Sequence, residues 1–220
     1  MRLFITGTDT EVGKSVVTAC LAAAAEGSVV AAKPVASGVA PGTAGEDALL
    51  LAAAAGHPPC TFVTLEAPVS PHRAARLEGR EIDRAGLLQW IRDLQADTVL
   101  VEGVGGWMVP ILLEEASVWV SDLAAATRGK VLVVADDTLG VLNRTLLTVR
   151  AIRADGFEVA AVVLNQRRPA DPSRASNASD LRELLDIGVG VLPALDISSQ
   201  SARREHGRML WSVLRSRESR

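Results

Sequence analysis

The chain has 220 residues, of which 48% are hydrophobic and 22% charged, and its formal net charge is −3. This slight acidity argues against a protein that binds nucleic acid through a basic surface, and the apolar fraction excludes a disordered chain. The length suits a single α/β domain over residues 1–220. Cys20 and Cys60 have neither the spacing of a zinc site nor that of a disulfide framework.

Short β-branched runs alternate along the chain with longer segments rich in Ala and Leu, which is typical of a parallel sheet with helices packed on it. Several of the short runs are almost continuously apolar, as expected for strands covered on both faces. The pattern predicts strands over residues 3–6, 29–33, 98–102, 131–135, 159–164 and 189–192. It predicts helices over residues 14–25, 46–55, 84–95, 120–127, 142–154, 178–186 and 202–215.

The connecting and terminal segments also carry signals. Residues 37–45 are rich in Gly, and residues 56–71 contain four Pro, which indicates an extended connection. Residues 202–220 combine six Arg with Leu and Trp. We interpret them as a docked terminal helix with a basic outer face, and a membrane-surface helix is the alternative.

The sequence predicts no membrane span and no signal peptide. The longest apolar stretch, residues 16–32, is interrupted by polar residues, and the first strand begins almost at Met1. We therefore expect a cytoplasmic protein that acts on neither a membrane nor nucleic acid.

The strongest motif directly follows the first strand. Gly7 and Gly13 bound a loop, and Gly13-Lys14-Ser15 opens the next helix. Glycines let backbone N–H groups approach phosphate oxygens, while Lys14 would neutralise the phosphates and the Ser15 hydroxyl would sit on Mg²⁺. The loop has five residues between its glycines, one more than the generic pattern. Strand, loop and helix together predict a phosphate-binding P-loop and a P-loop NTPase-like parallel sheet with helices on both faces.

Polar residues end other predicted strands at the same edge of the sheet, where open α/β folds bind ligands. Glu102 ends its strand and leads into Gly103, which makes it the first candidate for holding Mg²⁺. Asp136 and Asp137 are the second, weaker candidate. Lys33 ends the strand over 29–33 and is either a ligand for an anionic group of a second substrate or an exposed lysine.

The segment 137–143 leads into the helix predicted over 142–154. The free N–H groups of a helix start attract anions because they carry the positive end of the helix dipole. This segment either binds a substrate carboxylate or is an ordinary helix cap.

Four segments together resemble the dethiobiotin synthetase family, the ATP-dependent ligases of biotin biosynthesis. They are residues 6–15, 33–38, 70–72 and 101–107, and they occur in the family's order. The family's loop has the same five-residue spacing, so the longer loop favours it. The resemblance implies an enzyme that carboxylates 7,8-diaminopelargonate with CO₂ and closes the ureido ring through a carbamic-phosphoric anhydride. ATP would be the co-substrate, Mg²⁺ the cofactor, and ADP and phosphate the other products.

The resemblance also implies roles for the matching residues. The catalytic residues would be Lys33, Lys14, Glu11 and Thr10. The nucleotide would be bound by Glu11, Val12, Gly13, Lys14, Ser15, Val16, Asp47, Glu102, Gly103, Val104, Gly105, Asn165, Gln166, Pro193, Ala194 and Leu195. The second substrate would be bound by Ser37, Lys33, Thr10, Gly140, Val141, Leu142 and Asn143, and Mg²⁺ by Ser15, Asp47 and Glu102. Only the resemblance points to Asp47.

The family works as a homodimer with a shared active site, so the resemblance implies that one subunit's residues 139–143 reach the other's substrate carboxylate. Asp136 and Asp137 depart from the family, whose members often carry uncharged or basic residues there. A partition or cell-division ATPase, acting as a switch on DNA or membrane, is the alternative. It would carry a lysine where this chain has Asp9. A cobyrinate-type synthase would be longer.

Overall fold

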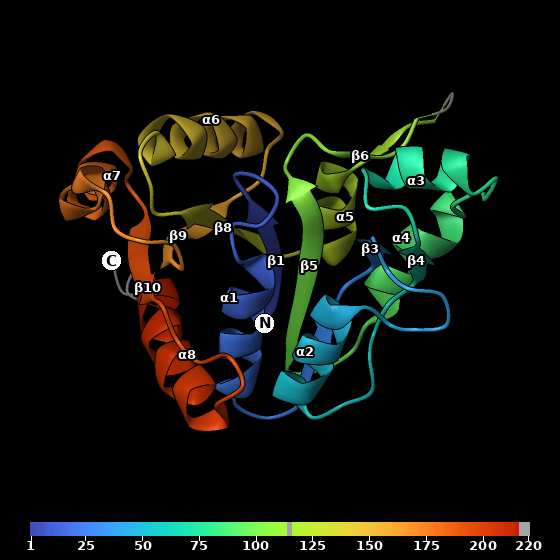
Figure 1. The fold of residues 1–220 in the computed structure, drawn as a ribbon, viewed down its shortest axis with the longest axis horizontal. Coiled ribbons are helices and arrows are strands. Elements are labelled where there is room, and N and C mark those ends of the chain that lie inside the picture. The colour runs from blue at the N-terminus through green and yellow to red at the C-terminus, as the bar shows by residue number, and fades with distance from the viewer. Residues whose placement is uncertain (114–115, 216–220) are drawn as a thin grey trace.

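The computed structural model describes residues 1–113 and 116–215. Its centre is a six-stranded parallel sheet with the strand order β10-β9-β8-β1-β5-β2 (Figure 1). The strands are β1 (Arg2–Gly7), β2 (Val29–Ala32), β5 (Thr98–Gly106), β8 (Lys130–Asp136), β9 (Val159–Gln166) and β10 (Gly188–Pro193). Because all six run in one direction, their carboxyl ends meet at one edge of the sheet.

Helices cover both faces of this sheet, which explains the nearly continuous apolar strands. One face packs against α1 (Lys14–Ala23), α2 (Glu46–Ala55) and α8 (Gln200–Arg215). The other packs against α4 (Arg84–Asp93), α5 (Val120–Thr127), α6 (Val141–Ala154) and α7 (Asn177–Leu184). Side chains of β1 alternate between the two cores, with Leu3 and Ile5 in the first and Phe4 in the second.

Short elements lie outside the main sheet. β3 (Val35–Ser37) pairs in parallel with β4 (Val63–Leu65), and β6 (Pro110–Leu112) pairs antiparallel with β7 (Val118–Trp119). The helix α3 (Pro71–Leu77) begins with a proline in its first turn, and the 3₁₀ helix η1 (Pro172–Ala175) precedes α7. The predicted extended connection over 56–71 therefore contains a strand, β4.

The predicted fold class is confirmed, as are the six strands and seven helices. The helices over 46–55 and 120–127 have the predicted bounds, whereas β5 runs four residues beyond the predicted strand, from Glu102 to Gly106. α8 is docked, because Leu210, Trp211 and Leu214 are buried, and residues 216–220 of that predicted segment lie outside the described residues. No described helix is long and apolar enough to cross a membrane.

Candidate active site

The P-loop joins β1 to α1 at the carboxyl edge of the sheet (Figure 1). Gly13 has a φ of 90°, and a Cβ there would lie 1.9 Å from the side-chain nitrogen of Asn165. A Cβ on Gly7 would lie 2.7 Å from the Asp9 carbonyl oxygen. Both positions therefore need glycine. Gly13 needs it for its backbone conformation and for space, and Gly7 needs it for space. Glu11 also has a positive φ, 57°, which is uncommon for a residue with a side chain and marks a constrained loop.

Lys14, the first residue of α1, points back over this loop. Its ammonium group donates a hydrogen bond to the Asp9 carbonyl oxygen at 3.0 Å, and the residue is buried. Burial, followed by the nearby charge of Lys33, lowers the pKa of Lys14 to about 8. The carboxylates of Glu102, Asp47 and Asp9 act in the opposite direction without outweighing these causes, and a phosphate group at the loop would add negative charge beside this buried lysine.

Four side chains from four separate segments of the chain meet beside the P-loop. Lys33 follows β2, and its Nζ lies 2.5 Å from Oε1 of Glu102 in β5 and 2.9 Å from Oδ2 of Asp47 in α2. The hydroxyl of Ser15 in α1 lies 2.6 Å from Asp47 Oδ1 and 2.8 Å from Glu102 Oε1. We call Ser15, Lys33, Asp47 and Glu102 the lysine–carboxylate cluster. Parallel pairing of β1 with β5, in which Ile5 is opposite Glu102, brings the glutamate next to the loop.

The charges of this cluster stabilise one another. Burial alone would lower the pKa of Lys33, but the carboxylates of Glu102 and Asp47 outweigh it and raise that pKa. Burial would likewise raise the pKa of Asp47, but Lys33 and the hydrogen bond from Ser15 outweigh it and lower the pKa. The cluster thus holds an ammonium group, at neutral pH, at a position that is only 4% exposed.

The donor set of the cluster suits a hard divalent cation. A single hydroxyl proton on Ser15 can serve only one carboxylate at a time, and Oε2 of Glu102 is buried without a hydrogen-bond partner among the described residues. Two carboxylates and a hydroxyl are the ligands that Mg²⁺ takes from proteins when phosphate and water complete its shell. Within the described residues no three His, Cys, Asp or Glu side chains converge, so phosphate oxygens would have to complete such a site.

Comparison with known proteins identifies the family to which this chain belongs. A model for an AAA domain matches residues 1–202. The ATP-dependent dethiobiotin synthetase of Anaeromyxobacter sp. (strain Fw109-5) is 44% identical over 81% of this chain and 83% of that protein. The chain belongs to the dethiobiotin synthetase family. A synthetase of the same name from Pseudomonas aeruginosa (strain PAO1) is 38% identical over 92% of this chain and 94% of its own length.

Comparison with a solved structure supports the fold. A plasmid partition protein from Borrelia burgdorferi B31, bound to AMPPNP, matches with a TM-score of 0.54 over 92% of this chain and 95% of that chain. The two sequences are only 10% identical, so this likeness concerns the fold alone. The resemblance inferred from the four motifs is confirmed, and this chain is an enzyme of the dethiobiotin synthetase family.

Residues expected to bind the nucleotide lie at the same carboxyl edge of the sheet. Asn165 in β9 is buried and donates a hydrogen bond from Nδ2 to the Val12 carbonyl oxygen of the P-loop at 3.1 Å. Gln166 ends β9 and lies opposite Pro193 in the pairing with β10, which places residues 193–195 beside it. Gly103, Val104 and Gly105 continue β5 past Glu102.

Other predicted residues that the structure describes are not bonded to the lysine–carboxylate cluster. Thr10 is exposed on the P-loop, and Ser37 ends β3. Gly140 precedes α6, which begins with Val141, Leu142 and Asn143. In the described part of the chain, no hydrogen bond or ion pair joins these residues to the cluster.

Asp136 and Asp137, the second candidate for holding Mg²⁺, are not part of the lysine–carboxylate cluster. Asp136 forms an ion pair with Arg168 at 2.5 Å, and Asp137 accepts hydrogen bonds from Gln166 and Asn177. Arg167, next to Arg168, donates to the Glu11 carbonyl oxygen of the P-loop. Sequence reasoning did not single out these arginines, although two basic residues directly after Asn165 and Gln166 at a strand end were an available signal.

Proposed function

We propose that this chain is an ATP- and Mg²⁺-dependent dethiobiotin synthetase. It would carboxylate 7,8-diaminopelargonate with CO₂ and close the ureido ring. The observation that carries the proposal is the ammonium group of Lys33, held between Glu102 and Asp47 beside the P-loop. A P-loop alone would support any nucleotide-binding protein, whereas a buried cation at this position suits an enzyme whose second substrate must become an anion.

The chemistry requires an anion to approach a triphosphate. CO₂ adds to one amine as a carbamate, and a carbamate oxygen attacks the γ-phosphorus of ATP while ADP leaves. The second amine then attacks the carbonyl carbon of the carbamic-phosphoric anhydride, and phosphate leaves. Lys33 would stabilise the carbamate, and Lys14 would offset charge on the transferring phosphoryl group, so catalysis is mainly positioning and electrostatics.

Three further residues would orient the substrates. Thr10 and Ser37 would hydrogen-bond the diamine or its carbamate, and Glu11 would orient an amine. Backbone N–H groups of the loop between Gly7 and Lys14 would bind phosphate oxygens, which suits the short contacts around both glycines.

The metal proposal rests on the oxygen ligands of the cluster. Ser15, Asp47 and Glu102 would hold Mg²⁺, with the unpartnered Oε2 of Glu102 as a further ligand atom. When bound, the cation would offset negative charge on the β- and γ-phosphates.

Base recognition would fall to the side of the P-loop formed by β9 and β10. Asn165 and Gln166 offer amide edges that can pair with a base, and the segment from Pro193 to Leu195 would lie against it. Asn165 already uses one N–H group on the P-loop, which leaves its carbonyl oxygen for the base.

We further propose that the enzyme is a cytoplasmic homodimer of single-domain subunits with shared active sites. The start of α6, from Gly140 to Asn143, would bind the substrate carboxylate in the partner's site through its free N–H groups. Leu139 and Leu147, at and near this start, are 78% and 58% exposed, which suits a surface that a second copy covers.

A coupled assay of ADP release tests the function. Purified enzyme with Mg²⁺, ATP and bicarbonate should release ADP only when 7,8-diaminopelargonate is added, and one dethiobiotin should form for each ADP. ATP hydrolysis that ignores the diamine but rises with DNA or lipid vesicles would contradict the proposal and favour the switch ATPases.

A further inference from the structure

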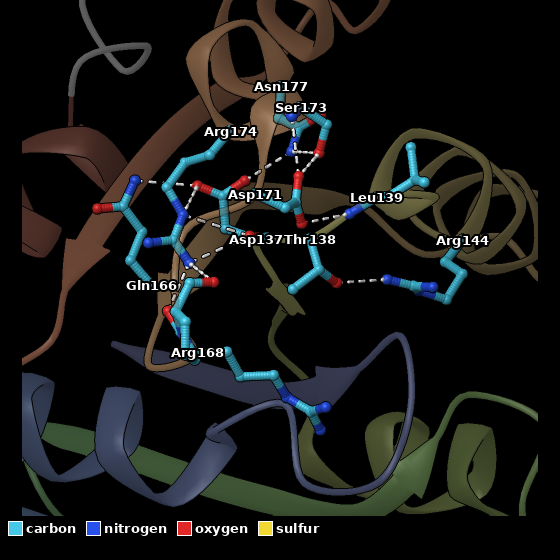
Figure 2. Close-up of polar contacts among 11 residues, drawn as sticks. Asp137, Thr138, Leu139, Arg144, Gln166, Arg168, Asp171, Ser173, Arg174 and Asn177 are labelled. Atoms are coloured by element: carbon cyan, nitrogen blue, oxygen red, sulfur yellow. Dashed lines mark hydrogen bonds and ion pairs between the residues drawn. The ribbon is translucent and has the colours of Figure 1, made fainter.

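A chain of hydrogen bonds outside the lysine–carboxylate cluster connects the end of β9 to the start of α6 (Figure 2). Its centre is Asp137, which is 1% exposed. Gln166 Nε2 donates to Asp137 Oδ2 at 2.9 Å, and Asn177 Nδ2 donates to Asp137 Oδ1 at 2.8 Å. One end of this chain is therefore Gln166, a residue of the proposed nucleotide site.

The chain continues through the loop before α7. Asn177 Nδ2 also donates to the Ser173 hydroxyl at 3.1 Å, and that hydroxyl donates to Asp171 Oδ1 at 2.5 Å. The other carboxylate oxygen of Asp171 accepts a hydrogen bond from the backbone N–H of Leu139 at 3.0 Å. The second end of the chain is thus the turn that begins α6 (Figure 2).

The geometry of this turn leaves the Leu139 N–H for Asp171. Val141 N donates to the Thr138 carbonyl oxygen at 3.0 Å, and Gly140 has φ 87° and ψ 0°, the values of the third residue of a type II turn. Leu139 is then the second residue, whose N–H takes no part in closing the turn. Asp171 consequently fixes how the turn, and the free N–H groups that follow it, are oriented.

The two carboxylates of the network, Asp137 and Asp171, have partners within the protein. Nε of Arg174 lies 3.8 Å from Asp137 Oδ2 and 3.4 Å from the Asp137 carbonyl oxygen. Hydrogen bonds from Ser173 and then Leu139 lower the pKa of Asp171, so it is an anion at neutral pH. Because hydrogen bonds to a charged group are stronger than neutral ones, Asp137 and Asp171 hold their partners firmly.

We propose that Asp137 and Asp171 are positioning residues that set the α6 turn for the substrate carboxylate and join it to the nucleotide residue Gln166. This inference rests on the proposed function, in which that turn serves the partner's site. Asp171 bonds directly to the turn. Asp137 contacts Gln166 directly and is connected to the turn through Asn177, Ser173 and Asp171.

Replacing Leu139 tests the role of Asp171 without touching the buried part of the network. Proline is favoured at this position of a type II turn but lacks the N–H, so L139P removes the bond to Asp171 and keeps the turn. L139A is the matched control, because it removes the same side chain and keeps the N–H. Relative to L139A, L139P should raise the KM for 7,8-diaminopelargonate about tenfold and change the KM for ATP by less than about twofold.

Equal KM values for L139P and L139A, in an enzyme whose wild type makes dethiobiotin, would overturn the inference and leave the proposed function standing. A wild type that does not use the diamine would overturn both. Gln166 and Asn177 each donate to a different oxygen of Asp137, and Asp137→Asn replaces one of these oxygens by an NH₂ group and removes the charge from both bonds. It should therefore raise the KM for ATP as well as for the diamine. An unchanged KM for ATP would overturn the role of Asp137, and thermal melting would show that the variant is folded.

Mixed dimers test whether the α6 turn binds substrate in the active site of its own subunit or in that of the partner subunit. In a heterodimer of one Lys33→Ala subunit and one L139P subunit, purified through two different tags, a turn that serves the partner's site puts both substitutions in one site. The other site is then intact, and the heterodimer should have the wild-type KM for the diamine. A KM raised as in the L139P homodimer would overturn the assignment of the turn to the partner's site.

Discussion

The two edges of the central sheet use their polar groups in opposite ways. At the carboxyl edge, charges are buried against one another, and several oxygens lack a hydrogen-bond partner among the described residues: Thr6 Oγ1, Thr8 Oγ1, Glu102 Oε2 and Asp136 Oδ1. Buried polar atoms without partners destabilise a protein, so they persist where a ligand completes them.

At the amino edge, polar groups lie near the surface and are paired. Asp97 precedes β5 and accepts hydrogen bonds from the backbone and hydroxyl of Ser28, which precedes β2. Lys130, at the start of β8, forms an ion pair with Glu158 at 2.8 Å. The difference indicates that the carboxyl edge is arranged for ligands and the amino edge for stability, and substitutions at the two edges should therefore affect different measurements.

The largest effect is expected at the carboxyl edge. Lys33→Ala removes the ammonium group beside the P-loop, so dethiobiotin formation should fall by about a thousandfold or more, while ATP affinity changes little. The ADP-release assay and calorimetric ATP titration measure the two quantities. Lys130→Ala, which removes a lysine of the amino edge, should leave turnover unchanged, and full turnover by Lys33→Ala would contradict its assigned role.

A packing change at the far end of α1 should affect stability instead. A Cβ on Gly207 of α8 would lie 2.0 Å from the Cys20 carbonyl oxygen of α1. Gly207→Ala therefore forces the two helices apart and should lower the free energy of unfolding by about 2 kcal/mol, as overpacking does. Urea denaturation measures the loss. A matched substitution, Gly56→Ala, meets no atom within 4 Å, although its φ of 75° adds strain, so comparing the two separates strain from overlap.

Arg2 tests the amino edge directly. Its guanidinium donates to the carbonyl oxygens of Thr127, Leu94 and Ile91, which lie at the carboxyl ends of α5 and α4. Arg2→Met should lower the free energy of unfolding by about 1–2 kcal/mol, because these carbonyls lose a charged donor. Turnover at a temperature where the variant is folded should stay normal. Impaired turnover by the folded Arg2→Met variant would contradict the assignment of the amino edge to stability alone.

The smallest effect is expected from Asp97. Hydrogen bonds from the Ser28 backbone and hydroxyl hold the pKa of Asp97 below its usual value, so folding favours the ionised form. Its contribution to stability is present above the ordinary pKa of an aspartate and is lost as the pH falls through the lowered one. The stability advantage of wild type over Asp97→Asn should therefore shrink in acid, as urea denaturation at a series of pH values would measure. A constant difference would contradict this account.

Long apolar runs made the main elements predictable. The six strands of the sheet are visible in the sequence because helices cover both faces. Lys33 and Glu102 follow from the rule that strand ends carry ligands, and Lys14 follows from the P-loop motif. The short strands were missed, since β3 and β4 are three-residue pairings that depend on partners far along the chain, such as Val35 opposite Val63.

Long-range contacts also limited what could be predicted of the site. Asp47 lies on α2, away from any strand end, and only the folded chain brings it to Lys33. Asp137 could be recognised as a strand-end acid but not as the partner of Gln166 and Asn177, because those contacts join segments 29 and 40 residues away. Sequence position therefore identified candidate residues better than it identified their partners.

The outer strand β2 constrains how two copies of this chain can assemble. Its outward backbone N–H group at Ala31 donates to His57 Nε2 at 3.0 Å, and that of Lys33, just past the strand, donates to the Cys60 carbonyl oxygen at 2.9 Å. These donors are already used within the subunit, so a second copy cannot extend the sheet by pairing a strand here. A dimer of this chain would therefore use a surface other than the β2 edge, so the subunits could separate without breaking strand pairs at that edge.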